Sequence, residues 1–179
     1  DYLRDNMVHN PEEMVQRMVM PSLEIIYGVT RGSLATVPPD KWAEHLAKGH
    51  APFRTIMFCV SVAQAELTAK IFNRAMQGKA NWICGKHHGE DREERMNGFR
   101  SGAIPIITNC GVLGEGVDVP ETELILQARP TKSLSLWVQQ LGRGTRTLPG
   151  VLTDKETPEE RIAAIKASAK KVVRVVDFA

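Results

Sequence analysis

Short apolar runs alternate with amphipathic stretches along the chain from residue 54 onward. The apolar runs cover residues 55–60, 81–84, 104–108, 123–128 and 172–176. The amphipathic stretches cover residues 61–78, 91–100, 133–146 and 157–171. Apolar strands that alternate with amphipathic helices are typical of a parallel sheet covered by helices on both faces. The pattern therefore predicts an α/β fold with three layers.

Capping signals support several of these helices. Ser61 with Gln64 predicts a helix start directly after the first strand, and Thr157 with Glu160 forms a capping box for a helix that extends to about Lys171. This last helix, at about 157–171, lies between Pro149-Gly150 and the closing strand, and we treat it as an insertion into the domain.

The first fifty residues lack a convincing strand. Asn10, Pro11 and Glu13 together predict a helix start, and residues 39–48 predict a second helix that stops at Gly49. We therefore predict a helical lead-in or linker at 1–50 and one domain at 51–179.

The composition fits a single soluble domain. The 179 residues include 23 Lys and Arg against 21 Asp and Glu, a net charge of +2. This length suits one hydrophobic core, and no apolar run approaches the ~18 residues that a membrane span requires. The three cysteines are odd in number and widely spaced, which favours a reducing cytoplasm over a disulfide framework. With Asp1 in first place and no signal-peptide pattern after it, we expect an excised fragment rather than a secreted precursor.

Positive charge gathers toward the end of the chain. Residues 132–179 hold nine basic and five acidic side chains, and Lys166, Lys170 and Lys171 are among the basic ones. This excess suits contact with phosphates, although an ordinary solvated surface accounts for it equally well.

The first segment with candidate chemistry is the glycine-rich loop from Cys110 to Asp118. It follows a predicted buried strand, and its glycines allow backbone N–H groups to approach a ligand closely. Its spacing matches neither the dinucleotide fingerprint nor the P-loop. By itself the loop is equally compatible with a tight turn between strands and with ligand binding.

The second segment with candidate chemistry runs from Gln139 to Arg146. On a continuous helix Arg143 and Arg146 share one face, so both guanidinium groups can bind one anion such as a polyphosphate. Two solvent-exposed arginines are the alternative. Gly142 and Gly144 each cost a helix ~1 kcal/mol, so a purely structural role explains the segment less well.

Taken together, the two segments resemble motifs V and VI of superfamily-two helicases. Residues 99–102, Thr108-Asn109-Cys110 and 115–120 resemble motif V, and residues 139–146 match the motif VI pattern Q-x-x-G-R-x-x-R. Arg129-Pro130-Thr131-Lys132-Ser133 and the closing Asp177-Phe178 are similar to the subgroup of restriction-enzyme motor subunits and prophage or repair helicases. The resemblance covers about residues 54–179 and implies a RecA-like lobe.

In that family two RecA-like lobes clamp ATP, and the resemblance implies roles for several residues of the second lobe. Arg146 corresponds to the arginine finger, Arg143 to its γ-phosphate-contacting companion, and Gln139 to a group that orders the attacking water or the arginines. The nucleotide-binding positions implied are Glu115, Gly116, Asp118 and Gly142. Ser61, Thr108 and Asn109 correspond to positions that contact the nucleic-acid backbone, although Ser61 as an ordinary N-cap is equally plausible from the sequence.

For two further features of the sequence, no functional site is the better expectation. Arg92 matches an arginine often seen in the intervening helix of this family, but a surface salt bridge is the better expectation. Cys84, His87 and His88 lie close in the sequence, but no second Cys or His pair follows at zinc-finger spacing, so we predict no metal site.

What the sequence lacks shapes the functional prediction. No G-x-x-x-x-G-K-S/T string and no D-E-x-H or D-E-A-D string occurs, so the groups that would hold ATP and Mg²⁺ must come mainly from an N-terminal lobe. We expect the isolated chain to be inactive as an ATPase. The leading hypothesis is the second lobe of an ATP-dependent DNA helicase or translocase, with RNA not excluded and restriction-modification or repair proteins as possible partners. The alternatives are a non-catalytic RecA-like interaction module and a stand-alone mononucleotide-binding protein.

Overall fold

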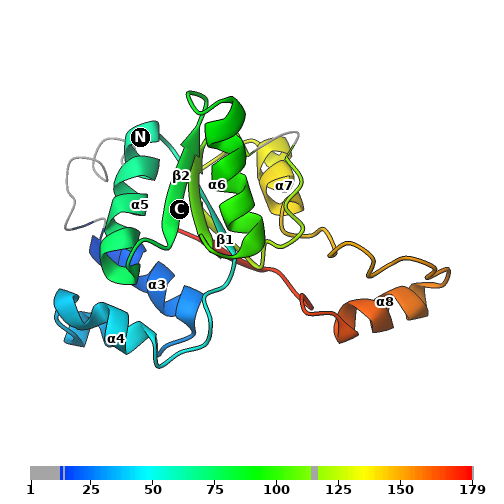
Figure 1. Ribbon diagram of the computed structural model, residues 1–179, viewed down its shortest axis with the longest axis horizontal. Coiled ribbons are helices and arrows are strands. Elements are labelled where there is room, and N and C mark those ends of the chain that lie inside the picture. Colours follow the sequence, from blue (N-terminus) through cyan, green and yellow to red (C-terminus); the bar gives the residue numbers. More distant parts are fainter. Residues whose placement is uncertain (1–12, 14, 114–116, 179) are drawn as a thin grey trace.

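A five-stranded parallel sheet lies at the centre of the protein, between two layers of helices (Figure 1). The computed structural model describes residues 13, 15–113 and 117–178. The strands are β1 (Thr55–Cys59), β2 (Ala80–Cys84), β3 (Ile106–Cys110), β4 (Leu124–Ala128) and β5 (Arg174–Asp177). Their order is β2-β3-β1-β4-β5, and each neighbouring pair is parallel. The predicted α/β fold is therefore confirmed.

The helices follow the predicted order, with shorter bounds in places. They are the π-helix η1 (Val15–Val19), α3 (Met20–Tyr27), the 3₁₀ turns η2 (Ser33–Thr36) and η3 (Pro39–Lys41), α4 (Trp42–Leu46), α5 (Val62–Met76), α6 (Gly89–Ser101), α7 (Leu134–Gly142) and α8 (Pro158–Ala167). The Ser61 Oγ accepts a hydrogen bond from the Gln64 N–H at 3.1 Å, and Thr157 with Glu160 forms the expected capping box. The predicted helix start at Asn10 and Pro11 lies outside the described residues. None of the described helices is both long and apolar enough to cross a membrane.

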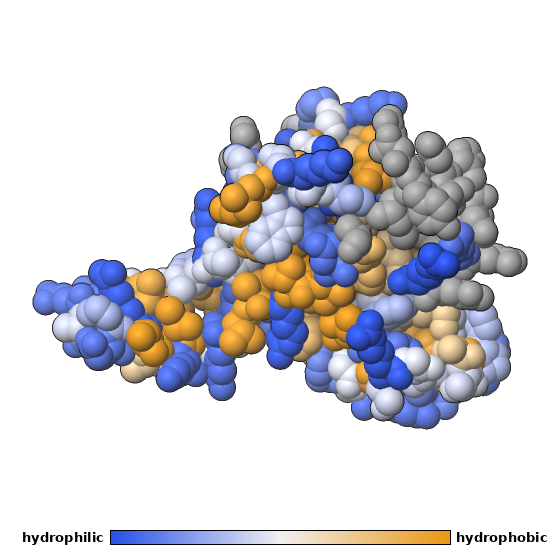
Figure 2. All heavy atoms as spheres, turned by 180° about the vertical axis from the view of Figure 1, so that it is seen from behind, coloured by the Kyte–Doolittle hydropathy of each residue, from blue (hydrophilic) through white to orange (hydrophobic). Residues whose placement is uncertain are grey.

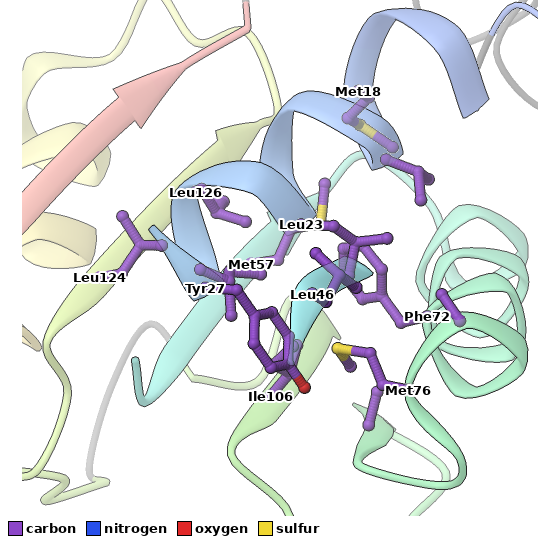
Figure 3. Packing of buried hydrophobic residues seen from close by; sticks show 14 of the residues in the cluster. Met18, Leu23, Tyr27, Leu46, Met57, Phe72, Met76, Ile106, Leu124 and Leu126 are labelled. Atoms are coloured by element: carbon purple, nitrogen blue, oxygen red, sulfur yellow. The ribbon is translucent and has the colours of Figure 1, made fainter. Parts of the chain in front are cut away.

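One face of the sheet packs against α3, α4 and α5 (Figure 3). Leu23 of α3, Leu46 of α4 and Phe72 of α5 are fully or almost fully buried against Met57 and Leu126 of the sheet. The described part of residues 1–50 thus shares one core with the strands. The predicted boundary near residue 50 stays a prediction.

The opposite face is covered by α6 and the end of α7. Its buried cluster contains Phe99 of α6 together with Ile56, Ile107 and Ile125 from the central strands, and Leu141 of α7 packs against it. The two faces together account for the near-continuous apolar character of β1, β3 and β4, whose residues are almost all buried, whereas the edge strand β5 is largely exposed.

Helix α8 lies apart from the rest of the molecule (Figure 1). No residue of α8 is buried, and the side chain of Ile162 is 53% exposed. The helix stops at Ala167 rather than near residue 171, because Ser168 takes an extended conformation and its Oγ donates a hydrogen bond to the Lys170 carbonyl at 2.6 Å. The space-filling view shows apolar atoms both on this arm and on the neighbouring face of the body (Figure 2).

A buried carboxylate joins α3 to the turn that follows it. Glu24 is 2% exposed, and its two carboxylate oxygens accept hydrogen bonds from the Gly32 N–H at 2.7 Å and the Leu34 N–H at 2.8 Å. Leu34 is itself part of the core. The carboxylate therefore fixes how the chain leaves α3 and how this layer closes over the sheet.

Replacing this carboxylate should destabilise the domain. We expect Glu24→Ala to lower the free energy of unfolding by about 1–3 kcal/mol, because a buried N–H group then loses its acceptor. Urea unfolding followed by circular dichroism measures the change. The control is Glu44→Ala, which removes an exposed carboxylate from α4 and should stay within about 0.5 kcal/mol of the unsubstituted chain. Equal effects of the two substitutions would contradict the structural role of Glu24.

Candidate functional site

The carboxyl ends of the three central strands lie at one edge of the sheet. Parallel pairing places Phe58 beside Asn109 and Cys59 beside Ala128. The segments that follow these strands, including the 111–118 loop, therefore emerge side by side. In open parallel sheets this edge is where ligands bind.

Arg143 joins the end of α7 to the glycine-rich loop. It is 9% exposed, and its Nη1 donates a hydrogen bond to the Val117 carbonyl at 2.7 Å. A guanidinium with five donors can hold such a carbonyl and still present other N–H groups. Arg143 thus holds the loop at Val117 against motif VI.

The prediction that Arg143 and Arg146 share one face of a continuous helix is wrong. Helix α7 ends at Gly142, and Arg143 is its C-cap. The hydrogen bonds tighten there to the i→i−3 type, from the Arg143 N–H to the Gln140 carbonyl and from the Gly144 N–H to the Leu141 carbonyl. Glycine favours this ending, because it is a weak helix former.

Arg146 nonetheless lies beside the other predicted segment. Its Nη1 and the Asp118 Oδ1 are 2.6 Å apart, and the two side chains are 48% and 67% exposed. An ion pair this exposed contributes little to stability and can exchange for another partner. The folded chain therefore joins the two candidate segments through one buried arginine and one exposed arginine.

Two hollows flank this junction. One, of about 250 Å³, is lined mainly by Asn109, Arg129, Gln139 and Gln140, with Phe58, Cys59, Gly111, Val112 and Leu136. The other, of about 530 Å³, lies between α6 and the loop and is lined by Gly89, Arg92, Glu93, Met96, Arg100, Val117 and Asp118. Gln139 and Asp118 thus line different hollows, and Gln139 lies with Asn109 and Arg129.

Thr108 and Asn109 are buried, so the expectation that both side chains face a nucleic-acid backbone needs correction. The Thr108 Oγ1 donates a hydrogen bond to the Ala65 carbonyl at 2.6 Å, and this side chain is fully buried. The Asn109 Nδ2 donates to the Met57 carbonyl at 2.9 Å. The Asn109 Oδ1, however, has no hydrogen-bond partner among the described residues. Thr108 therefore ties β3 to α5, and of these two residues only Asn109 lines the smaller hollow.

The remaining predicted residues are less constrained. The Ser61 Oγ already accepts a hydrogen bond from its own helix, as an ordinary N-cap does. An added Cβ at Gly142 would meet no heavy atom within 4 Å, so the structure leaves open space beside it. Glu115 and Gly116 lie outside the described residues.

Sequence reasoning missed three contacts that shape the site. The Gln127 Nε2 donates a hydrogen bond to the Gln140 Oε1 at 3.0 Å inside the protein. The polar Gln127 within an apolar strand was the one sequence signal for this contact. The Lys170 Nζ donates to the Pro120 and Arg146 carbonyls at 2.6 and 2.7 Å, and burial lowers the pKa of this amine. Arg92 donates to the Val112 carbonyl at 3.3 Å instead of forming the expected surface salt bridge.

His87 has a structural role at the end of β2. Its Nδ1 accepts a hydrogen bond from the Cys84 N–H at 3.0 Å, and burial lowers the pKa of its imidazole, which favours the neutral form needed for this contact. No three potential metal ligands converge within the part of the chain that the structure describes.

Comparison with known proteins is consistent with this geometry. The family described as the helicase conserved C-terminal domain matches residues 39–147. The chain is 33% identical over 92 residues to a Saccharomyces cerevisiae protein whose name is that of an ATP-dependent helicase, IRC3, and the match covers 51% of this chain and 13% of that protein. It is 29% identical over 93 residues to nucleolar RNA helicase 2 of Rattus norvegicus, covering 52% of this chain and 12% of that protein.

A solved structure extends the similarity in fold. A fragment from Vibrio vulnificus YJ016, described as an HsdR subunit of a type I restriction enzyme, aligns with a TM-score of 0.55 at 20% identity. The alignment covers 90% of this chain and 28% of that one. The chain thus spans only a small part of the proteins that it resembles.

Gly144 should be far less tolerant of substitution than Gly142. An added Cβ at Gly144 would lie 2.4 Å from Val173 Cγ2 and 2.9 Å from Ile125 Cδ1, whereas Gly142 has open space. We expect Gly144→Ala to lower the free energy of unfolding by about 1–3 kcal/mol through overpacking. Gly142→Ala, the matched control, should leave it unchanged or raise it by up to about 1 kcal/mol. Urea unfolding of both variants tests the assignment, and a Gly144→Ala variant as stable as the control would contradict the close packing.

Proposed function

Because this chain belongs to the family of helicase conserved C-terminal domains, we propose that it is the second motor lobe of an ATP-dependent nucleic-acid helicase or translocase. The observation that carries the proposal is the junction of the two motifs, in which Arg143 contacts Val117 and Arg146 pairs with Asp118. This junction holds a cationic group at the carboxyl edge of the sheet, where an ATP-binding lobe could meet it.

Arg146 is the proposed arginine finger. Phosphoryl transfer develops charge on the transferred group, and an arginine that enters the site from a second lobe stabilises that charge. Roughly half of the Arg146 side chain is exposed, so it can leave Asp118 for a phosphate without breaking the core. Asp118 is then available to a ribose hydroxyl.

Arg143 is proposed to act mainly by positioning. It is almost completely buried and holds the Val117 carbonyl, so its removal would disturb the loop as well as any contact to the γ-phosphate. Glu115, Gly116 and Gly142 remain proposed nucleotide contacts on the strength of the motif resemblance. ATP and Mg²⁺ would be held mainly by Walker A and Walker B groups of the other lobe, since this sequence contains neither motif.

The smaller hollow is the proposed nucleic-acid contact. Arg129 supplies positive charge to its lining, and Asn109, Gln139 and Gln140 supply polar side chains. A contact to the nucleic-acid strand is thus proposed for Gln139, beside the role that the motif implies for it in ordering the attacking water or the arginines. Ser61, at the start of α5, would contribute backbone N–H groups, and contacts of this kind bind phosphates with little sequence preference.

DNA is the proposed substrate class. The support comes from Glu115-Gly116-x-Asp118 and Arg129-Pro130-Thr131, which are similar to the motor-subunit subgroup. Restriction-modification or repair proteins are then the proposed partners. The three cysteines are free, which agrees with a cytoplasmic location.

The arginine finger can be tested in a protein that joins this chain to an ATP-binding lobe with both Walker motifs. Arg146→Ala should lower nucleic-acid-stimulated ATPase activity by about 10³-fold or more. Arg143→Lys, which keeps the charge with less disturbance of the fold than alanine, should lower activity through the lost fork geometry. The control is Arg74→Ala, which removes an exposed arginine from α5 that is distant in sequence from both motifs.

If Arg146→Ala kept nearly the same stimulated ATPase activity as the Arg74→Ala control, Arg146 would not be the arginine finger. A joined protein that binds nucleic acid without any stimulated ATPase would instead favour the non-catalytic interaction module. Tight ATP binding by the isolated chain in calorimetry would favour the stand-alone nucleotide-binding protein.

The substrate class has a separate test. ATPase activity of the joined protein should be stimulated more by DNA than by RNA of the same sequence and length, and Arg129→Gln should weaken DNA binding and reduce its dependence on salt concentration. Fluorescence anisotropy over a salt series measures the binding. Equal stimulation by both nucleic acids would contradict the DNA assignment, and an unchanged salt slope would contradict the role of Arg129.

A further inference from the structure

The three cysteines form a row across the carboxyl edge of the sheet. Cys84 is the last residue of β2, Cys110 of β3 and Cys59 of β1, and these strands are neighbours in the order β2-β3-β1. Cys84 pairs directly with Cys110 in the parallel register, and Cys59 follows the Phe58–Asn109 pair, which puts it beside Cys110 on the other side. The sequence separates these thiols widely, but the sheet brings them together.

The register places Cys84 and Cys110 within reach of a disulfide. Neighbouring strands are about 4.8 Å apart, which lies inside the range of about 4.4–6.8 Å between the Cα atoms of bridged cysteines. Cys59 and Cys84 are separated by two strand spacings, about 10 Å, which is too far for a bridge. Cys110 is therefore the shared member of both possible pairs.

The position of β2 at the edge of the sheet favours Cys84 over Cys59. Directly paired strands hold their Cβ atoms somewhat too far apart for a relaxed disulfide, so one strand must shift. β2 has a neighbour on one side only and runs into Gly85, where an added Cβ would meet nothing within 4 Å. β1 is fixed between β3 and β4, and Cys59 is packed in the core.

We propose that Cys84 and Cys110 form a reversible, peroxide-sensitive thiol pair directly before the 111–118 loop. Cys110 is partly exposed, and Cys84 is fully buried beside it. The Cys110 thiolate attacks a peroxide oxygen to give a sulfenic acid with release of water after protonation. The Cys84 thiolate then attacks the Cys110 sulfur, the S–S bond forms and a second water leaves. One peroxide is thus reduced to two waters while two thiols are oxidised to one disulfide.

The surroundings set how the pair reacts. Burial raises the pKa of the Cys110 thiol and the neighbouring Cys84 raises it further, whereas Arg129 opposes this shift. Because the thiolate is the nucleophile, the rate of oxidation should rise with pH through and above the ordinary thiol range. A disulfide between directly paired strands is strained, so mild thiol reductants should open it readily.

The test uses the 179-residue chain with hydrogen peroxide. Titration of denatured protein should find three thiols before treatment and one afterwards, with dithiothreitol restoring the other two. Peptide mapping should identify a Cys84–Cys110 bridge within a monomer on non-reducing gels. Cys59→Ser should lose both of its thiols to the same bridge. Cys84→Ser should form no bridge within the chain and should lose only its Cys110 thiol, as a sulfenic acid that dithiothreitol reduces.

Three outcomes would overturn the proposal. These are a bridge between Cys59 and Cys110, a disulfide between two copies of the chain, or irreversible oxidation of Cys110 without any bridge. Cys84→Ala provides a second variant if Cys84→Ser fails to fold, and a thermal melt of each reduced variant checks folding. The measurement requires no ATPase activity, so it is independent of the proposed motor function.

Discussion

The in-register parallel pairing of β1 with β3 and β4 is the constraint on which the rest of this structure depends. Parallel strands in register end at the same edge, so whatever follows each strand emerges beside its neighbours. Motif V follows β3, and motif VI follows β4 through α7. Their meeting is thus a consequence of the sheet, and helices pack against both faces of that sheet.

Burial distinguishes the two motif VI arginines. Arg143 is enclosed and fixes the Val117 backbone, whereas Arg146 pairs with Asp118 at the surface. A buried arginine that holds a carbonyl resists rearrangement, while an exposed ion pair exchanges at little cost. The same short segment therefore combines a buried arginine that is held in place with an exposed arginine whose ion pair exchanges easily. Lys170, which follows α8 in the sequence, adds a second anchor, because its Nζ donates a hydrogen bond to the Arg146 carbonyl.

Much of the fold could be predicted from local patterns. The strand at 55–60, the Ser61 cap and the Thr157 capping box each depend on residues close together in the sequence, and each appears in the structure near its predicted place. The end of α7 could not be predicted in the same way. Helical periodicity continues to Arg146, but the helix ends at Gly142, and Gly144 beyond it packs closely on Ile125 and Val173, which are distant in the sequence.

By itself the sequence determined the α/β class, the order of the elements and the two motifs, because periodicity, capping and motif spacing are local properties. Only the tertiary structure decided which of the motif side chains are buried and which line a hollow. Thr108 and Asn109 are adjacent in sequence, yet the Thr108 hydroxyl bonds to α5 while Asn109 bonds to β1 and lines a hollow. The sequence likewise does not predict that the three cysteines lie in one row. Both depend on strand order and register, which arise from contacts between residues far apart along the chain.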